Sequence, residues 1–226
     1  MSPRAGGAIR EALSSENWPQ GLEYVKAHLS KALVSQAVAT LYEQDPTLRW
    51  RAVEAVGVLT AALFQRDPQA ARDVLRRLMW SLNEESGSIG WGAPGALAET
   101  MAREPSLAEE FLPVFFSRIQ GAHLESIPPV LCEGFLWAML RLWEAFPEAV
   151  SGADLEPVLM RLLDSPSASA RAMAALALGK LHARKAAPAL RALLHDSECF
   201  ETFKDGRLVK NTVAETARQA LEFLDK

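Results

Sequence analysis

A group of small residues recurs along this chain at an almost constant interval. The segments Arg49–Leu59 and Arg171–Leu181 align residue for residue, each with an arginine, two alanines three positions apart, a glycine and a leucine. The first small residues of five such segments, separated by 41, 41, 40 and 40 positions, are Ala52, Ala93, Gly134, Ala174 and Ala214. A repeat of this length constrains the fold more strongly than any other feature of the sequence.

Small residues three positions apart lie on one face of a helix and allow a second helix to approach closely. An amphipathic segment follows most of them, in Gln69–Leu82, Ser106–Ile119, Asp154–Leu163 and Ala186–Leu194. Alanine and leucine supply 69 of the 226 residues, whereas valine, isoleucine and threonine supply 24, which favours helices over sheets. We therefore expect an all-α protein, an α-solenoid of about five stacked helix pairs that forms a single domain over residues 1–226.

The segment Asp164–Asp196 resembles the HEAT-like repeat of the phycobilisome-lyase type. The residues that carry this match are Arg171, Ala174, Ala177, Leu178, Gly179, Leu181, Pro188, Leu190 and Leu194. The whole chain also resembles an uncharacterised bacterial group of HEAT-repeat proteins, in Trp80–Pro94, Gly134–Leu142 and Phe203–Val213. The resemblance implies a superhelix of HEAT-like helix pairs and carries no particular activity. The third repeat departs from the pattern, with Trp137 where alanine is expected.

An alternation of polar and apolar residues surrounds Asp205-Gly206. This dipeptide favours a two-residue turn in which both residues have positive φ. We expect a β-hairpin insertion near residues 200–210, followed by a terminal helix with Asn211 or Thr212 as its N-cap. The hairpin is expected to shield the end of the solenoid, and the alternative is that it offers a docking edge.

The linker between the first two repeats, residues 83–94, contains three glycines, a tryptophan and two adjacent acids. Linkers of this kind are more often functional than the cores of repeats. We therefore take Asn83, Glu84, Glu85 and Trp91 as candidate partner-binding residues. In the alternative interpretation the linker is structural, a helix cap in which Trp91 is an aromatic plug buried between repeats.

No set of residues suggests a metal site or a catalytic centre. The four histidines are dispersed along the chain and form no HExxH motif, and the two cysteines form no CxxC motif. We expect no catalytic residue, no metal and no cofactor. A reduced, cytoplasmic protein is expected, because no signal peptide or membrane-spanning run is visible.

Charge is distributed unevenly along the chain. The formal net charge is −4, but residues 81–160 alone hold 3 basic and 12 acidic side chains. Such acidity repels phosphate backbones, which argues against nucleic acid as a partner and against a HEAT-like DNA-repair glycosylase. We expect a non-enzymatic scaffold or adaptor that binds another protein and neither nucleic acid nor a membrane. A lyase-like or chaperone-like helper in cofactor attachment is the alternative that the resemblance suggests.

Overall fold

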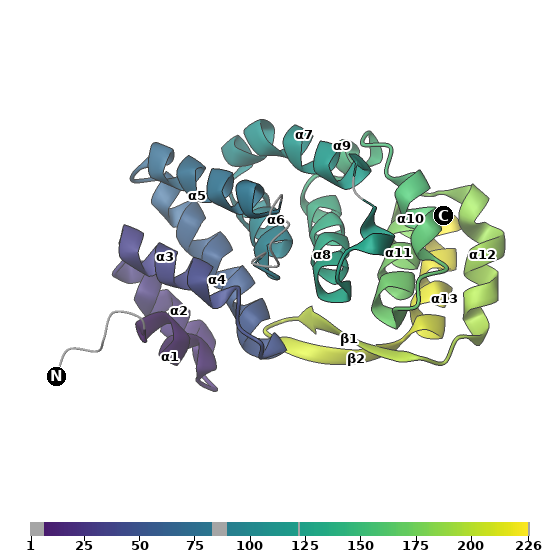
Figure 1. The fold of residues 1–226 in the computed structure, drawn as a ribbon, viewed down its shortest axis with the longest axis horizontal. Coiled ribbons are helices and arrows are strands. Elements are labelled where there is room, and N and C mark those ends of the chain that lie inside the picture. The colour runs from purple at the N-terminus through teal and green to yellow at the C-terminus, as the bar shows by residue number, and fades with distance from the viewer. Residues whose placement is uncertain (1–6, 83–89, 122, 226) are drawn as a thin grey trace. The chain divides into compact units, whose positions relative to one another are not determined.

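The computed structural model describes residues 7–82, 90–121 and 123–225. The fold is an all-α solenoid that is 74% helical, with 13 α-helices in the described part of the chain (Figure 1). The helices form two compact units, residues 1–112 and residues 113–226. Within the described ranges, no helix is both long enough and apolar enough to cross a membrane.

The first unit is built from helices alone. Its elements are α1 (Ala8–Ser14), α2 (Trp18–Ala27), α3 (Lys31–Thr40), α4 (Pro46–Phe64), α5 (Pro68–Ser81), α6 (Ala93–Arg103) and the start of α7 (Pro105–Gly121). Asp45 and Asp67 cap α4 and α5, and their carboxylates accept hydrogen bonds from backbone N–H groups of the first turn at 2.8 and 3.0 Å. Each cap is followed by a proline at the first helical position, where its missing N–H removes no intrahelical bond.

Helices α4 and α6 approach closely along their small residues. Ala52 and Ala55 of α4 and Ala96 of α6 have no exposed surface. At Gly57 a Cβ atom would lie 2.5 Å from Cγ of Glu99, so α6 occupies the space that a larger side chain needs. The small residues therefore set the distance between these two first helices, as the sequence pattern predicts.

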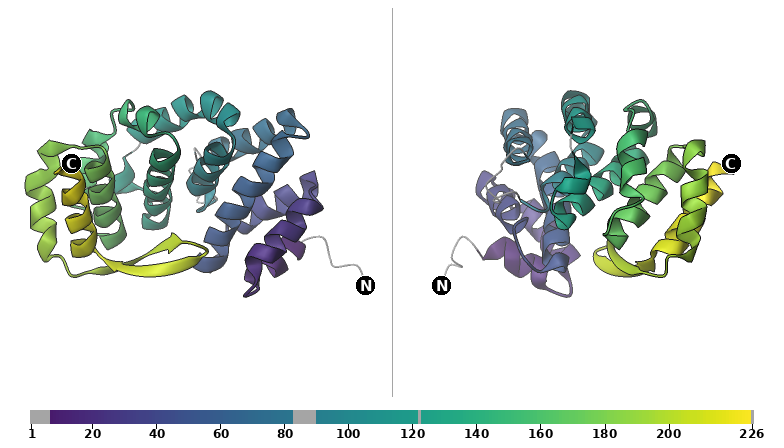
Figure 2. Two further views of the ribbon diagram at one scale, coloured as in Figure 1. Left: turned by 180° about the vertical axis from the view of Figure 1, so that it is seen from behind. Right: turned by 45° about the vertical axis from the view of Figure 1, so that its right-hand side comes forward.

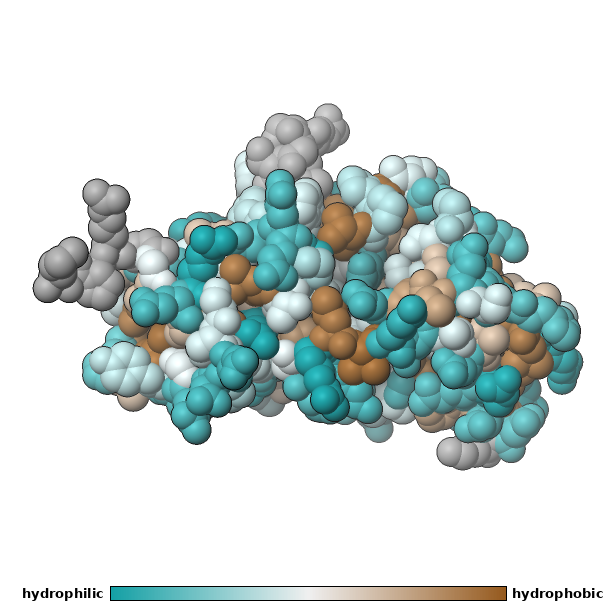
Figure 3. All heavy atoms as spheres, turned by 90° about the horizontal axis from the view of Figure 1, so that it is seen from below, coloured by the Kyte–Doolittle hydropathy of each residue, from teal (hydrophilic) through white to brown (hydrophobic). Residues whose placement is uncertain are grey.

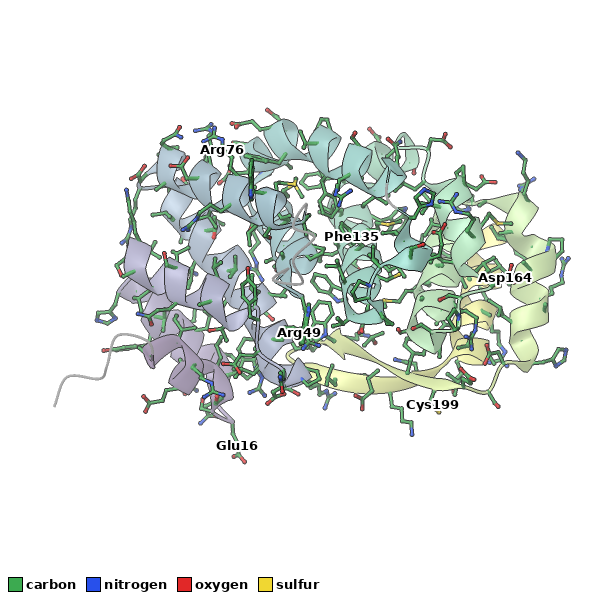
Figure 4. All side chains as sticks on the ribbon, viewed as in Figure 1. Glu16, Arg49, Arg76, Phe135, Asp164 and Cys199 are labelled. Carbon is green, nitrogen blue, oxygen red and sulfur yellow. The ribbon has the colours of Figure 1, made fainter. Side chains whose placement is uncertain are left out.

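The second unit combines helices with one hairpin. Its elements are the end of α7, the 3-10 turn η1 (Leu124–Ser126), α8 (Pro129–Ala145), α9 (Pro147–Ser151), α10 (Glu156–Leu162), α11 (Ala168–Lys180), η2 (Arg184–Ala186), α12 (Ala187–Ala192), η3 (Leu193–His195), β1 (Cys199–Lys204), β2 (Arg207–Thr212) and α13 (Val213–Leu224). The aromatic rings of Phe115 and Phe135, 6.0 Å apart, form part of its core (Figure 4).

The predicted hairpin is present. Strands β1 and β2 pair antiparallel over their whole length, and the left view of Figure 2 shows them as an extended two-stranded arm. The turn residues Asp205 and Gly206 have φ angles of 50° and 79°, both positive, as a type I′ turn requires. Thr212 is the N-cap of α13, and it forms a reciprocal capping box with Glu215.

The five small residues of the repeat lie on five successive first helices: α4, α6, α8, α11 and α13. They do not lie at the same depth along those helices, because Ala93 is the first residue of α6 and Ala214 the second residue of α13. Ala214 is also half-buried, whereas the other four are buried. The interval therefore identifies the first helices correctly and predicts their boundaries less well. Three helices, α1 to α3, precede the part of the chain in which the repeat was recognised.

Candidate functional site

Trp91 lies in the described part of the chain, whereas Asn83, Glu84 and Glu85 lie outside the described residues. Trp91 occupies the turn directly before α6, and its side chain is half-buried. The half-buried side chain of Trp91 does not decide between the two interpretations of the linker. A structural plug requires a fully buried ring, and a recognition residue requires an accessible one. The contacts around the ring describe the site further.

The two glycines beside Trp91 hold the turn against the end of α3. A Cβ atom at Gly90 would lie 3.1 Å from Cζ of Tyr42, and one at Gly92 would lie 2.9 Å from Cδ2 of Leu41. The backbone N–H of Gly92 donates to the carbonyl oxygen of Leu41 at 3.3 Å, and that of Ala93 donates to Gly90 at 2.8 Å. The absence of side chains at both glycines lets the backbone come this close. The backbone of Trp91 is consequently held by contacts of the residues before and after it in the chain.

The guanidinium of Arg49, a residue labelled in Figure 4, lies against the ring of Trp91, with its Cζ atom 5.6 Å from the ring centroid. Arg49 is on α4, its side chain is buried, and its Nη1 atom donates to the carbonyl oxygens of Glu43 and Gln44 at 2.9 and 3.4 Å. A cation placed over an aromatic face is attracted by the ring quadrupole, more strongly when it is partly desolvated. Arg49 therefore connects the α3–α4 loop to the turn that carries Trp91.

Arg171 occupies the equivalent position in the fourth repeat and makes an equivalent backbone contact. Its Nη1 atom donates to the carbonyl oxygen of Ser165, six residues earlier, at 2.7 Å, which is the sequence separation also seen at Arg49. Its guanidinium then forms ion pairs with Asp196 at 2.7 Å and Glu198 at 2.8 Å. Burial alone lowers the pKa of Arg171, but the hydrogen bonds to Glu198 and Asp196 raise it above the ordinary value. Both arginines thus brace a first helix against the chain segments around it.

Tyr42 completes the exposed part of the site. Its side chain is 47% exposed and packs beside Gly90 at the end of the α3 segment. We call the exposed side chain of Tyr42 and the half-buried side chain of Trp91 the Tyr42–Trp91 surface. Gly90, which packs beside Tyr42, and Arg49, which lies against Trp91, are buried. Sequence reasoning found Trp91 and missed Tyr42, because Tyr42 lies outside every recognised repeat. The alignment of Arg49 with Arg171 was a usable signal for the arginine.

Two other reactive side chains among the described residues, Cys132 and Lys180, have pKa values shifted by burial. Within the described residues, no group of three or more histidine, cysteine, aspartate or glutamate side chains is placed to hold a metal ion. Burial raises the pKa of the Cys132 thiol to about 12, so the thiol is protonated at neutral pH. The Nζ atom of Lys180 lies 4.0 Å from the ring centroid of Trp143 and 5.0 Å from that of Phe223, and burial lowers its pKa. All of these groups lie in the second unit, where Cys132 is buried and Lys180, Trp143 and Phe223 are half-buried.

Comparisons with known proteins agree with the helix pairs. A sequence profile that describes HEAT repeats matches residues 141–200. An uncharacterised protein of Archaeoglobus fulgidus is 30% identical over 98 residues, which cover 43% of this chain and 50% of that protein. The match thus extends over about half the length of this relative.

Among solved structures, the designed armadillo repeat protein YIII(Dq)4CqI is similar over 96% of this chain and 98% of its own, with a TM-score of 0.56 and 19% identity. A related designed armadillo protein, solved in complex with the peptide (KR)4, has a TM-score of 0.55 and 17% identity over 96% and 98% of the two chains. Identities this low establish the fold alone. Taken together, the profile match over residues 141–200, the helix pairs and these neighbours support a HEAT-like helical-repeat fold for this chain.

Proposed function

We propose that this chain is a non-enzymatic scaffold or adaptor that binds a partner protein through the Tyr42–Trp91 surface. HEAT and armadillo repeats are typical of protein-interaction scaffolds. The observation that carries the proposal is the arrangement at Trp91: the ring is partly accessible, yet the turn around it is fixed by Gly90, Gly92 and Arg49.

A fixed aromatic ring is well suited to binding. Tryptophan, tyrosine and arginine dominate interface hot spots, because they bury a large area and have few rotatable bonds or many donors. A ring that is already immobilised in the free protein loses little conformational entropy when a partner covers it. Two backbone hydrogen bonds, from Gly92 to Leu41 and from Ala93 to Gly90, hold the turn that carries Trp91, and the ring of Tyr42 lies beside Gly90.

Charge favours a basic partner over an acidic one. Residues 81–160, which include the linker and α6, hold 12 acidic and 3 basic side chains. One structural neighbour was solved with the peptide (KR)4, and this supports a polypeptide ligand for a chain of this fold. A positively charged partner segment fits both observations.

Substitutions at the surface test the proposal. We expect Trp91→Ala and Tyr42→Ala each to weaken capture of a partner from the source organism by tenfold or more, a loss of about 1.4 kcal/mol. Tyr24→Ala is the matched control, because Tyr24 is 67% exposed and lies on α2 of the same unit. It should leave capture unchanged.

Thermal melting separates binding from folding in the same variants. Recognition predicts that Trp91→Ala melts within a few degrees of the parent and loses the partner. If Trp91→Ala instead loses about 3–5 kcal/mol of stability, as burial of a large ring implies, while the folded fraction still captures the partner, the ring is structural and the proposal is wrong.

The lyase-like or chaperone-like role in cofactor attachment stays an alternative, resting on the resemblance of Asp164–Asp196 to phycobilisome-lyase-type repeats. A HEAT-like DNA-repair role predicts salt-sensitive binding of duplex DNA. We expect no such binding at physiological salt, and fluorescence anisotropy with a labelled duplex measures it. The cytoplasmic location and the single-domain organisation also stay predictions.

A further inference from the structure

The hairpin of the second unit has two edges that differ in how their backbone groups are used. In an antiparallel pair closed by a two-residue turn, alternate residues direct N–H and C=O groups toward the partner strand and away from it. The turn at Asp205-Gly206 makes Lys204 and Arg207 a hydrogen-bonded pair, so the next pair, Phe203 and Leu208, directs its backbone groups outward. Glu201 and Lys210 follow the same outward pattern two residues further on.

The outer edge of β1 is partly covered. The indole Nε1 of Trp137, on α8, donates to the outward carbonyl oxygen of Phe203 at 3.3 Å. This contact confirms the direction of the backbone groups in that pair. It also places the side chain of a helix against the edge, where a further strand would have to bind.

The outer edge of β2 is open. Within the part of the chain that the structure describes, no group donates to or accepts from the outward N–H and C=O of Leu208 or Lys210. At Thr212, the last residue of β2, the outward N–H donates to the Glu215 carboxylate at 3.0 Å. A strand whose outward N–H and C=O groups are unpaired can form backbone hydrogen bonds with an added strand.

The side chains of β2 specify the charge of a strand that fits this edge. Arg207 and Lys210 are exposed, β2 carries no acidic residue, and the exposed Lys204 lies opposite Arg207. Glu201 lies opposite Lys210, yet neither basic residue of β2 forms an ion pair with any described residue. The surface viewed from below, toward which the hairpin faces, carries polar and apolar side chains interspersed (Figure 3). Leu208 and Val209, both half-buried, supply the apolar part of the edge.

We propose that β2 is a docking strand for an extended, acidic segment of a partner protein, which adds to the hairpin as a third strand. Backbone bonds to Leu208 and Lys210 hold the segment, and two carboxylates spaced three residues apart face Arg207 and Lys210 on opposite faces of the sheet. The like-charged side chains of β2 disfavour pairing with the same strand of a second copy. This surface shares no residue with the Tyr42–Trp91 surface.

A labelled peptide of sequence T-V-E-V-T-E-V-T, with blocked ends, is a direct probe, and T-V-K-V-T-K-V-T is its charge-reversed control. Fluorescence anisotropy on the full chain should show saturable binding of the acidic peptide that weakens as salt is raised. The basic peptide should bind several-fold more weakly, because charge pairs at an exposed edge contribute modestly.

The edge itself is tested by Leu208→Pro, with Leu208→Val as the matched control. Proline removes an N–H that points away from β1, so the hairpin ladder stays intact while the docking edge loses a donor and gains a steric block. We expect Leu208→Pro to weaken binding of the acidic peptide roughly tenfold or more and Leu208→Val to change it less than about twofold.

Amide hydrogen exchange on the unaltered chain gives an answer even if the proline variant does not fold. Bound acidic peptide should slow exchange at Leu208 and Lys210 and leave Val209, whose N–H faces β1, almost unchanged. Equal binding by the Leu208→Pro and Leu208→Val variants, slowed exchange confined to other elements, or no binding at millimolar peptide would each overturn the proposal. A dimer in sedimentation experiments that Leu208→Pro abolishes would also overturn it, by assigning the edge to a second copy.

Discussion

Substitution of Gly179 by alanine tests the close approach of α11 and α13. A Cβ atom at Gly179 would lie 2.5 Å from the carbonyl oxygen and 2.7 Å from Cα of Ala220, both backbone atoms that no rotamer change can move. The helices must separate by roughly 0.9 Å before the new methyl group reaches ordinary contact distance. Overpacking of this kind costs about 1–3 kcal/mol, and the better helix propensity of alanine offsets about 0.5–1 kcal/mol. The difference is a net loss of about 0–2.5 kcal/mol, and we expect about 1–2 kcal/mol because both clashing atoms of Ala220 belong to the backbone.

Thermal unfolding followed by circular dichroism measures this loss. For a chain of this size, 1 kcal/mol lowers Tm by about 2–4 °C, so Gly179→Ala should lower Tm by roughly 2–8 °C. Gly121→Ala is the matched control, because Gly121 is the last residue of α7 and a Cβ atom there meets nothing within 4 Å. It should leave Tm unchanged or raise it. If Gly179→Ala melts at or above the control, the two helices are not as close as the argument requires.

Three further outcomes follow from the second unit. Ala174→Leu should cost about 1–3 kcal/mol in thermal unfolding, since Ala174 is fully buried on α11. Iodoacetamide at pH 8 should label the exposed Cys199 and leave Cys132 unmodified in the folded protein, because burial raises the pKa of the Cys132 thiol to about 12; equal labelling would contradict this. Hydrogen bonds from Thr212 lower the pKa of Glu215, so the cap stabilises the fold above the ordinary glutamate pKa of about 4.3 and loses this effect as pH falls below it. Thr212→Ala should cost about 1 kcal/mol at pH 7 and clearly less at pH 3 in pH-dependent melts.

The repeat, the hairpin and the N-cap of α13 were predictable because each depends on local chemistry. Small residues at helical spacing identify a buried helix face, and Asp205-Gly206 favours positive φ at both positions of the turn whatever surrounds it. The boundaries of α6 were less predictable. Ala93 shares the pattern of Ala52, but α6 begins only at Ala93, after the turn at Trp91 and Gly92.

The candidate site was only partly predictable, because it depends on contacts between distant segments. Trp91 stood out by its residue type, whereas Tyr42 joins it only because Gly90 packs against the tyrosine ring. The contact of Arg49 with the ring of Trp91 was not predictable from the sequence either. Arg49 and Arg171 occupy the same position in two repeats. Arg171 pairs with carboxylates, whereas Arg49 lies against an aromatic ring, and the repeat spacing alone does not predict this difference.

The two ends of the hairpin insertion meet at its base. The N–H of Val213 donates to the carbonyl oxygen of Glu198 at 3.0 Å, and the N–H of Ala214 donates to that of Asp196 at 2.9 Å. The chain therefore leaves the helical stack and returns to it at nearly the same point. Such a site tolerates a change of length, because the entropy of closing the loop grows only slowly with the number of residues. We therefore expect residues inserted at the Asp205-Gly206 turn to leave the two backbone hydrogen bonds at the base of the arm in place.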